Sequence, residues 1–332
     1  MFSGSTIAGV VLCLVVLIIL ADVAYRVYAA RQIQHLIENV PPFGVIEDRR
    51  DIANEPVTIS VDSSNRHSDP DCQLAASVYQ PENQAKAVVV FCHELDGNRW
   101  TAMHYIEALV DASIAVVSFD FCNHGESTAV ANYTPIHWIT QLEVTHLDAV
   151  LNWVKSDHRF DGLKMGLFGV SRGGCAALIA ASTRSDIAAV VTDSAYSTRS
   201  LIWSFTGRFS RHVCPPWFFN RLPTWHVWQD INSAIRLNQR KTGQQYLHLE
   251  DVVDRLHSNV LMIAGSRDSY VTASVRDQLV AMLPAETESW LVPKAKHNRA
   301  RSIATAQYDA KIVNHFQQHL MDSSASKTAS IQ

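Results

Sequence analysis

The residue types and spacing around a serine between two glycines give the strongest indication of chemistry in the sequence. The stretch Gly169-Val-Ser171-Arg-Gly173 follows an apolar run at 164–168 and precedes a small-residue pattern that is typical of a helix. A sharp turn from a strand into a helix places the serine hydroxyl at its apex, and flanking glycines avoid collisions with neighbouring backbone. The helix N-terminus and the N–H of Arg172 favour a developing negative charge. Ser171 is therefore a candidate nucleophile.

An acid and a histidine follow the serine in the order that such a nucleophile needs. Asp268 in "AGSRDSYV" and His297 in "PKAKHNRA" each come directly after an apolar run. The carboxyl ends of parallel strands gather ligand-binding side chains at one edge of a sheet. Alone, Asp268 could be a turn or helix-capping residue, and His297 a solvated loop histidine. Together, in this order, they predict a triad with Ser171.

Two further loops supply the rest of the predicted site. His93 follows the run at 87–92, and the N–H of Leu95 in its loop is the expected second oxyanion donor beside that of Arg172. The segment "FDFCNHGES" begins at residue 119 and predicts a tight turn held by side-chain hydrogen bonds. Structural roles near the site are assigned to His93, Asp120, Gly169 and Gly173.

Two other assignments remain open on the residues alone. Asp193, at the end of the sixth apolar run, could replace Asp268 as the acid. A metal site from His93, His124 and Asp120 is conceivable, but no carboxylate–histidine spacing repeats along the chain. The six cysteines are scattered without a Cys-x-x-Cys pair, so neither a zinc site nor a redox dithiol is indicated. We expect neither a metal nor another cofactor.

The elements that must position these residues alternate along the chain. Eight apolar runs predict strands, and several are continuous, which suits strands buried on both faces of a sheet. Helical patterns follow from the third run onward, so we predict an α/β fold with a mostly parallel eight-stranded sheet and helices on both faces. The first two runs should form an antiparallel edge hairpin. The runs are 57–61, 74–79, 87–92, 114–120, 164–168, 188–193, 259–265 and 289–293.

A long insert interrupts this alternation. Residues 199–256 separate the sixth and seventh runs by more than an ordinary connection. They contain the tryptophans at 203, 217, 225 and 228. These aromatics could form a small core for an extra helical layer, or the inner wall of a lid over the site. We expect one insert to serve as both.

The N-terminus is apolar enough to enter a membrane. Residues 1–21 carry no charge, and the stretch from Thr6 to Tyr25 has about the 20 residues that cross a bilayer, with Asp22 near its end. A cleaved signal peptide would need a basic start and a nearby cleavage site, and "MFSGST" contains no Lys or Arg, so we favour a single-pass anchor. Basic residues only follow the span, which predicts that the remaining chain is cytoplasmic.

These patterns divide the chain into four parts. Residues 1–30 form the anchor, 31–54 a connector, 55–320 the α/β domain with the insert 199–256, and 321–332 a polar tail that should be flexible. The 332 residues are 47% hydrophobic, which is ample for one large domain. A net charge of −4 gives no indication of nucleic-acid binding.

On the loop at His93, the turn beginning at Asp120, the Gly169–Gly173 segment and the later Asp268 and His297, the chain resembles the α/β-hydrolase superfamily over about residues 55–320. With "HELDGN", "GVSRGG" and the anchor, it is most similar to the membrane-anchored Bem46-like hydrolases and the serine-aminopeptidase-like group. The resemblance implies cofactor-free hydrolysis of an ester, thioester or amide. One departure is Glu94, where the family usually has glycine.

The resulting expectation is a serine hydrolase that forms an acyl-enzyme on Ser171. The aromatic insert and the anchor favour a small-molecule substrate with an apolar acyl group, with lipid-derived substrates as one option; peptidase activity is less favoured. The same triad would serve an acyltransferase, and no sequence feature separates the two. A membrane-tethered scaffold without catalysis is the third option, and Glu94 is the one feature in its favour, because a carboxylate could repel the transition-state charge.

Overall fold

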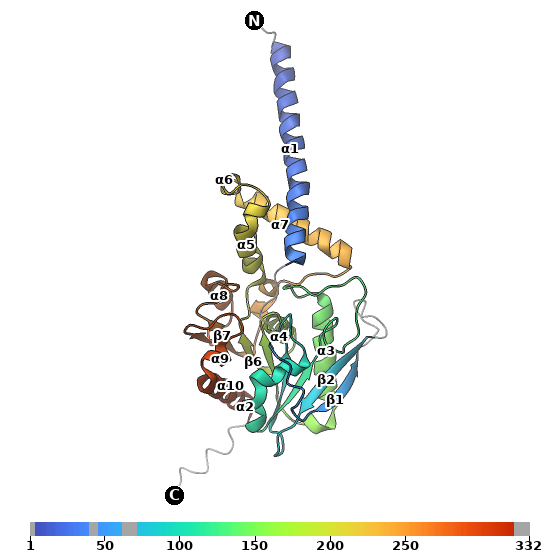
Figure 1. Cartoon of the computed structure of the whole chain (residues 1–332), viewed down its shortest axis with the longest axis vertical. Coiled ribbons are helices and arrows are strands. Elements are labelled where there is room, and N and C mark those ends of the chain that lie inside the picture. The colour runs from blue at the N-terminus through green and yellow to red at the C-terminus, as the bar shows by residue number, and fades with distance from the viewer. Residues whose placement is uncertain (1–3, 40–45, 62–71, 322–332) are drawn as a thin grey trace. The chain divides into compact units, whose positions relative to one another are not determined.

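The structure is a computed structural model that describes residues 4–39, 46–61 and 72–321. The chain folds into two compact units (Figure 1). The first combines Met1–Pro41 with Ser204–Gly243, and the second combines Pro42–Trp203 with Gln244–Gln332. We call them, after the roles that the sequence predicts for them, the anchor unit and the catalytic unit.

The catalytic unit is built on one eight-stranded sheet. Its strand order is β1-β2-β4-β3-β5-β6-β7-β8. β2 runs antiparallel to both β1 and β4, and all other neighbours are parallel. The predicted parallel sheet with an antiparallel edge hairpin is therefore confirmed. The strands are β1 (Glu55–Ser60), β2 (Gln73–Tyr79), β3 (Ala87–Cys92), β4 (Ile114–Phe119), β5 (Met165–Val170), β6 (Ile187–Asp193), β7 (Asn259–Gly265) and β8 (Glu288–Val292).

Helices cover both faces of this sheet because its central strands are apolar on both sides. α2 (Met103–Asp111) and α10 (Thr305–Leu320) bury their apolar side chains against Phe168 and Val170 of β5. α4 (Arg172–Thr183) packs on β5 and β6, with α3 (Gln141–Ser156) beside it. The remaining helices are α8 (Ala273–Val280) and α9 (Ala300–Ile303), and short 3-10 helices lie at Arg99–Ala102, His158–Phe160, Leu249–Asp251 and Val253–Arg255.

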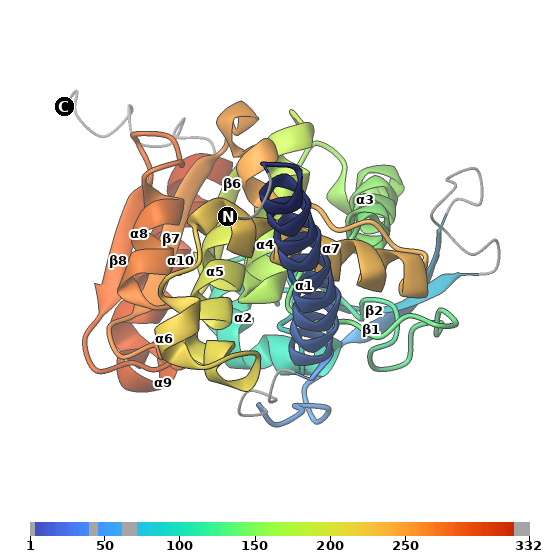
Figure 2. The same ribbon diagram turned by 90° about the horizontal axis from the view of Figure 1, so that it is seen from above.

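The anchor unit pairs the N-terminal helix with part of the insert. It contains α1 (Gly4–Glu38), the end of α5 (Thr198–Phe209), a 3-10 turn (Ser210–His212), α6 (Pro216–Phe219) and α7 (Thr224–Thr242). α1 and the long helix α7 pack against each other (Figures 1 and 2). Apolar side chains on the two helices are buried, namely Ala29, Ala30, Ile33 and Ile37 on α1 and Val227, Ile231 and Ala234 on α7.

Polar contacts accompany this apolar packing along the two helices. Asp22 Oδ1 lies 2.8 Å from the Nε2 atom of His226. Further along, Glu38 accepts hydrogen bonds from Asn238 at 2.7 Å and from Lys241 at 2.8 Å. The contacts occur in the same order along both helices, so the second half of α1 and α7 run in the same direction.

Two predicted boundaries differ from the structure. The predicted anchor ended at residue 30, but α1 continues to Glu38 because 29–37 carry an apolar stripe at helical spacing that faces a partner. The insert 199–256 was assigned wholly to the α/β domain, whereas residues 204–243 group with α1. In the predicted tail, residues 322–332 lie outside the described part of the chain.

The first half of α1 differs from the second in what surrounds it. Its apolar side chains from Ile7 to Val23 are exposed rather than packed in a core. From Thr6 onward the helix is long and apolar enough to cross a membrane, a property that an N-terminal signal sequence would share.

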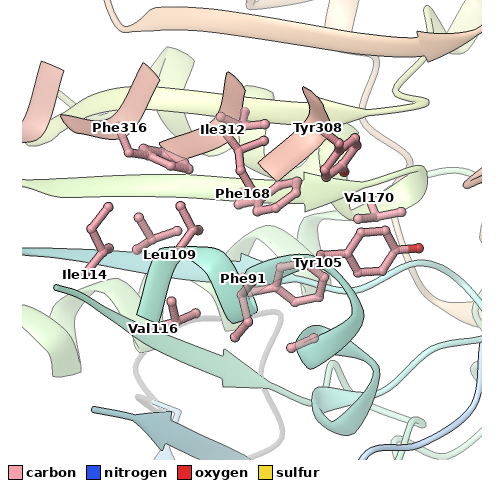
Figure 3. Close-up of a cluster of buried hydrophobic side chains, with 14 of the residues drawn as sticks. Phe91, Tyr105, Leu109, Ile114, Val116, Phe168, Val170, Tyr308, Ile312 and Phe316 are labelled. Atoms are coloured by element: carbon pink, nitrogen blue, oxygen red, sulfur yellow. The ribbon is translucent and has the colours of Figure 1, made fainter. Parts of the chain in front are cut away.

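The core between β3, β5, α2 and α10 generates a first prediction. Phe168 is fully buried, with its ring 5.4 Å from that of Phe91 and 6.2 Å from that of Tyr105 (Figure 3). Phe168→Ala should lower the free energy of unfolding by about 3–5 kcal/mol, because it leaves a cavity in a close-packed core. Urea unfolding followed by circular dichroism measures the loss, and Phe168→Leu should lose less. Equal urea midpoints for wild type and Phe168→Ala would contradict this packing.

Candidate active site

The turn between β5 and α4 holds Ser171 in a backbone conformation that residues other than glycine rarely adopt. Its φ is 52° and its ψ is −117°. The Ser171 N–H donates to the carbonyl oxygen of Asp193 at 2.7 Å, and the Ser171 carbonyl accepts from the N–H of Cys175 at 3.2 Å. These bonds on both sides of the residue hold the strained turn in place, as is typical of functional sites.

The two flanking glycines are sterically required. A Cβ atom on Gly169 would lie 2.4 Å from the carbonyl oxygen of Gly173. A Cβ atom on Gly173 would lie 2.1 Å from the carbonyl oxygen of Cys92 and 2.5 Å from that of His93. Because all of these obstacles are backbone atoms, no rotamer change can relieve them.

The structure brings Ser171, His297 and Asp268 into one hydrogen-bonded chain. Ser171 Oγ lies 2.9 Å from His297 Nε2, and His297 Nδ1 lies 2.7 Å from Asp268 Oδ2. The other Asp268 oxygen accepts from the N–H groups of Tyr270 and Val271 at 2.8 and 2.9 Å. Nδ1 donates to the carboxylate, which leaves the Nε2 lone pair facing the serine hydroxyl. That arrangement suits proton abstraction from Ser171.

The three side chains are also withdrawn from solvent. Ser171 is 1% exposed and His297 is 8% exposed, and the Asp268 carboxylate is buried. They come from the turns after β5, β8 and β7, at one edge of the parallel sheet. Hydrogen bonds in such a site face little competition from water.

Asp193, the alternative acid, is hydrogen-bonded elsewhere. Its carboxylate accepts from the Tyr308 hydroxyl at 2.9 Å and from the Ser194 hydroxyl at 2.8 Å. Ser194 Oγ in turn accepts from the backbone N–H of Asn298 at 3.2 Å. Asn298 follows His297, so this chain of bonds steadies the loop that carries the imidazole. Burial raises the pKa of Asp193 to about 6.

The side chain of Arg172 is bound by buried groups that hold the turn between β5 and α4 in place. Its guanidinium pairs with Glu143 at 2.6 Å and donates through Nε to the carbonyl of Ile136 at 2.6 Å, with both charged groups buried. Glu143 also forms a capping box with Thr140 at the start of α3. Glu143 is not among the residues predicted from the sequence, although the Thr-x-x-Glu spacing indicates a capping box. Its pairing with Arg172 could be recognised only in the folded structure.

The loop after β3 is held by two histidines, of which His93 is buried and His124 is half-buried. His93 Nδ1 donates to the carbonyl of Glu94 at 2.6 Å, while Nε2 accepts from the N–H of Phe121 at 3.1 Å. The carbonyl of Glu94 shares its peptide with the N–H of Leu95, so the His93 contact fixes that peptide, while His124 Nε2 lies 2.6 Å from the Leu95 carbonyl oxygen and fixes the next one. Burial holds the pKa of His93 well below its ordinary value, so the ring is neutral.

The turn at Asp120 is built from its carboxylate, as the sequence predicts for a structural turn. Asp120 accepts from the backbone N–H of Arg99 at 2.6 Å and of Glu126 at 2.8 Å, and pairs with the guanidinium of Arg99. The Ser127 hydroxyl donates to the Asp120 carbonyl at 2.6 Å. Gly125 has a φ of +49°, and any Cβ there would collide with this carboxylate. Both oxygens are engaged, so the side chains weighed for a metal serve the turn and the loop instead.

Comparisons with known proteins agree with this architecture. Esterase Pf2001 of Pyrococcus furiosus superposes with a TM-score of 0.60 at 19% identity, covering 85% of this chain and 97% of that one. Est1E of Butyrivibrio proteoclasticus, solved with ferulic acid, gives 0.54 at 16% identity, covering 78% and 99%. At these identities the likeness concerns the fold.

An uncharacterised 31.7 kDa protein of Escherichia coli, from the traX-finO intergenic region, is 24% identical over 126 residues. The match spans 37% of this chain and 43% of the Escherichia coli protein. A sequence profile of the family described as putative esterases matches residues 68–263, more than half of the chain. The chain therefore belongs to the putative esterase family and has the α/β-hydrolase fold.

Proposed function

We propose that the protein hydrolyses carboxylic esters through an acyl-enzyme on Ser171. The observation that carries the proposal is the buried chain of hydrogen bonds from Ser171 through His297 to Asp268, at 2.9 and 2.7 Å. Membership of the putative esterase family supports an ester as the substrate class. The positive φ at Ser171 adds support, because it directs the hydroxyl out of the turn.

In this mechanism His297 removes the proton as Ser171 Oγ attacks the carbonyl carbon. Asp268 orients the imidazole and stabilises its cation. The N–H groups of Arg172 and Leu95 bind the oxyanion of the tetrahedral intermediate. The C–O bond of the ester breaks, and His297 returns the proton to the departing alcohol. Water then attacks the acyl-enzyme, loses a proton to the same imidazole and releases the acid.

The geometry of the turn at Ser171 supports the assignment of these two N–H groups as oxyanion donors. Arg172 begins α4, and the first N–H groups of a helix have no partner within the helix. Gly173 rests against the carbonyls of Cys92 and His93, which brings the start of α4 to the loop that contains Leu95. This approach supports the proposal that one backbone donor from each element binds the oxyanion.

An apolar acyl group and attachment to a membrane belong to the same proposal. Cleavage of α1 as a signal peptide would uncover Val227, Ile231 and Ala234 on α7 and leave Asn238 and Lys241 without Glu38. Retaining α1 avoids that exposure of apolar surface. We therefore propose an uncleaved anchor that holds the esterase at a bilayer, where apolar acyl substrates concentrate.

Glu94 does not oppose this chemistry in the way that a charged group would. Its side chain is 5% exposed and lies over Gly97, where a Cβ atom would come within 2.7 Å of the carboxyl carbon. Burial is the main cause that raises its pKa to about 7; the negative charges of Asp96 and Asp193 act in the same direction and Arg299 acts against them. Below about pH 7 the uncharged acid therefore predominates, and that form does not repel an oxyanion.

Substitution of the triad tests the proposed function. Ser171→Ala should abolish labelling by a fluorophosphonate probe, and Ser171→Ala or His297→Ala should lower kcat for a p-nitrophenyl ester by on the order of 10⁴-fold or more. Ser182→Ala is a matched control, since that serine is buried on the same helix α4 and bonds to the Leu178 carbonyl. It should label and turn over as wild type does. Labelling of the Ser171→Ala protein, or full activity of His297→Ala, would refute the assignment.

Glu94→Gln tests the buried acid through the pH dependence of stability. A folded-state pKa near 7 against an ordinary 4.5 means that the folded chain holds a proton that the unfolded chain releases. Stability is therefore fully present below pH 4.5 and falls as the pH rises towards 7. Between about pH 5 and pH 8 wild type should lose about 2 kcal/mol more than Glu94→Gln, measured by urea unfolding. Parallel pH profiles for the two proteins would contradict a raised pKa.

A further inference from the structure

The insert contacts α1 at one particular level of that helix. The ring of Tyr25 lies 5.4 Å from that of Phe218 and 5.7 Å from that of His226, between ring centres. The guanidinium of Arg26 lies 5.7 Å from the ring centre of Trp225. All of these groups lie within the anchor unit.

This level coincides with the end of the apolar segment of α1. A series of exposed apolar side chains runs from Ile7 to Val23, and Arg26 is the first basic residue; of the large apolar side chains that follow it on α1, only Val27 and Tyr28 are exposed. At 1.5 Å per residue, the twenty residues from Thr6 to Tyr25 span about 30 Å, the thickness of the hydrocarbon layer. A bilayer crossed by α1 would therefore have its surface beside Tyr25 and Arg26.

The insert exposes two large aromatic side chains close to this level. Trp217 is 63% exposed and Trp225 is 58% exposed, although indole rings are usually largely buried. Trp217 is the chain neighbour of Phe218 and lies at the start of α6, and Trp225 lies in the first turn of α7. Tryptophan is enriched at the boundary between lipid and water, where its ring contacts hydrocarbon and its N–H contacts the headgroups.

The charge of this segment fits a lipid surface as well. Residues 204–229 contain Arg208, Arg211 and Arg221 but no Asp or Glu. Basic residues interleaved with aromatic ones are typical of segments that lie on anionic membranes. Each arginine near such a surface adds electrostatic attraction to the anionic headgroups.

We infer that residues 208–225 form a membrane-docking surface that seats Trp217 and Trp225 among the headgroups of an anionic bilayer, on the side where α1 emerges. A protein partner is the alternative occupant of this surface. Lipid is favoured because the contacts of Tyr25 and Asp22 with Phe218 and His226 fix the surface at the level where α1 leaves the hydrocarbon. This inference goes beyond ester hydrolysis; it rests on the proposed membrane anchor and not on the chemistry at Ser171.

The test uses the full-length chain in liposomes of phosphatidylcholine and phosphatidylglycerol that carry bromine near the headgroup end of their acyl chains. Bromine quenches the emission of indole rings that it contacts. The double variant Trp217→Phe, Trp225→Phe should lose most of the bromine-quenched emission of wild type. The matched control Trp153→Phe, Trp290→Phe in the catalytic unit should retain it. Phenylalanine keeps an aromatic ring at each position, and unchanged circular dichroism shows that each variant folds.

The contribution of charge has its own measurement. Replacing phosphatidylglycerol with phosphatidylcholine should reduce the quenching of the wild-type chain. The triple variant Arg208→Gln, Arg211→Gln, Arg221→Gln should show the reduced value in both kinds of liposome. Quenching that ignores lipid charge would overturn the anionic preference.

Three other results overturn the inference. The first is quenching that persists in the double tryptophan variant while the chain stays with the liposomes after an alkaline carbonate wash. The second is protection of Trp217 and Trp225 from aqueous iodide without quenching by bromine, because that protection comes from protein. The third is release of the chain by the wash, which removes the anchor on which the inference rests. None of these results bears on Ser171, which the labelling experiment tests separately.

Discussion

The close approach of α4 to the end of β3 is the contact on which the arrangement of the site depends. A Cβ atom on Gly173 would lie 2.1 Å from the carbonyl oxygen of Cys92, so the helix can begin there only with glycine. This approach forces the chain to turn sharply at Ser171 and brings the start of α4 beside the loop from His93 to Leu95. The strained backbone at Ser171, the proposed nucleophile, and the approach of the two proposed N–H donors both follow from this one steric contact. The surrounding hydrogen bonds maintain it.

Four buried carboxyl groups near the site differ in whether a positive side chain pairs with them. Glu143 is paired with Arg172, and Asp120 is paired with Arg99, so each negative charge has a positive partner within contact distance. Glu94 and Asp193 have no such direct ion pair among the described residues, and burial raises their pKa values to about 7 and about 6. Desolvation favours the uncharged form of a carboxyl group unless a counter-charge compensates. The turn at Ser171 is thus held by paired charges, and burial disfavours the charged form of the two carboxyl groups that lack such a partner.

The strands and the proposed triad could be predicted from the sequence, whereas the side-chain partners around the triad could not, because they come from segments that only the fold brings together. Buried parallel strands leave continuous apolar runs, so all eight strands were predicted within a few residues of their bounds. Ser171, Asp268 and His297 could be proposed as a triad because each directly follows such a run, and the structure joins the three by hydrogen bonds. The pairing of Arg172 with Glu143 and the link from Asp193 through Ser194 to Asn298 join segments that are far apart in the sequence. No local pattern encodes those partners. The pKa of Glu94 likewise depends on burial that only the fold provides.

The pairing of α1 with α7 also defines how the insert can move. Glu38 binds Asn238 and Lys241 while Asp22 contacts His226, so the two helices are joined at both ends of their shared length. A hinge that swung α7 alone would have to break these bonds and expose the apolar surface between the helices. Any large displacement of α7 would therefore carry α1 with it. If α1 spans a bilayer, its tilt is set partly by the match between its apolar length and the hydrocarbon thickness. The resting angle of the insert then becomes a function of lipid chain length, and the same protein would hold this segment differently in thin and thick membranes.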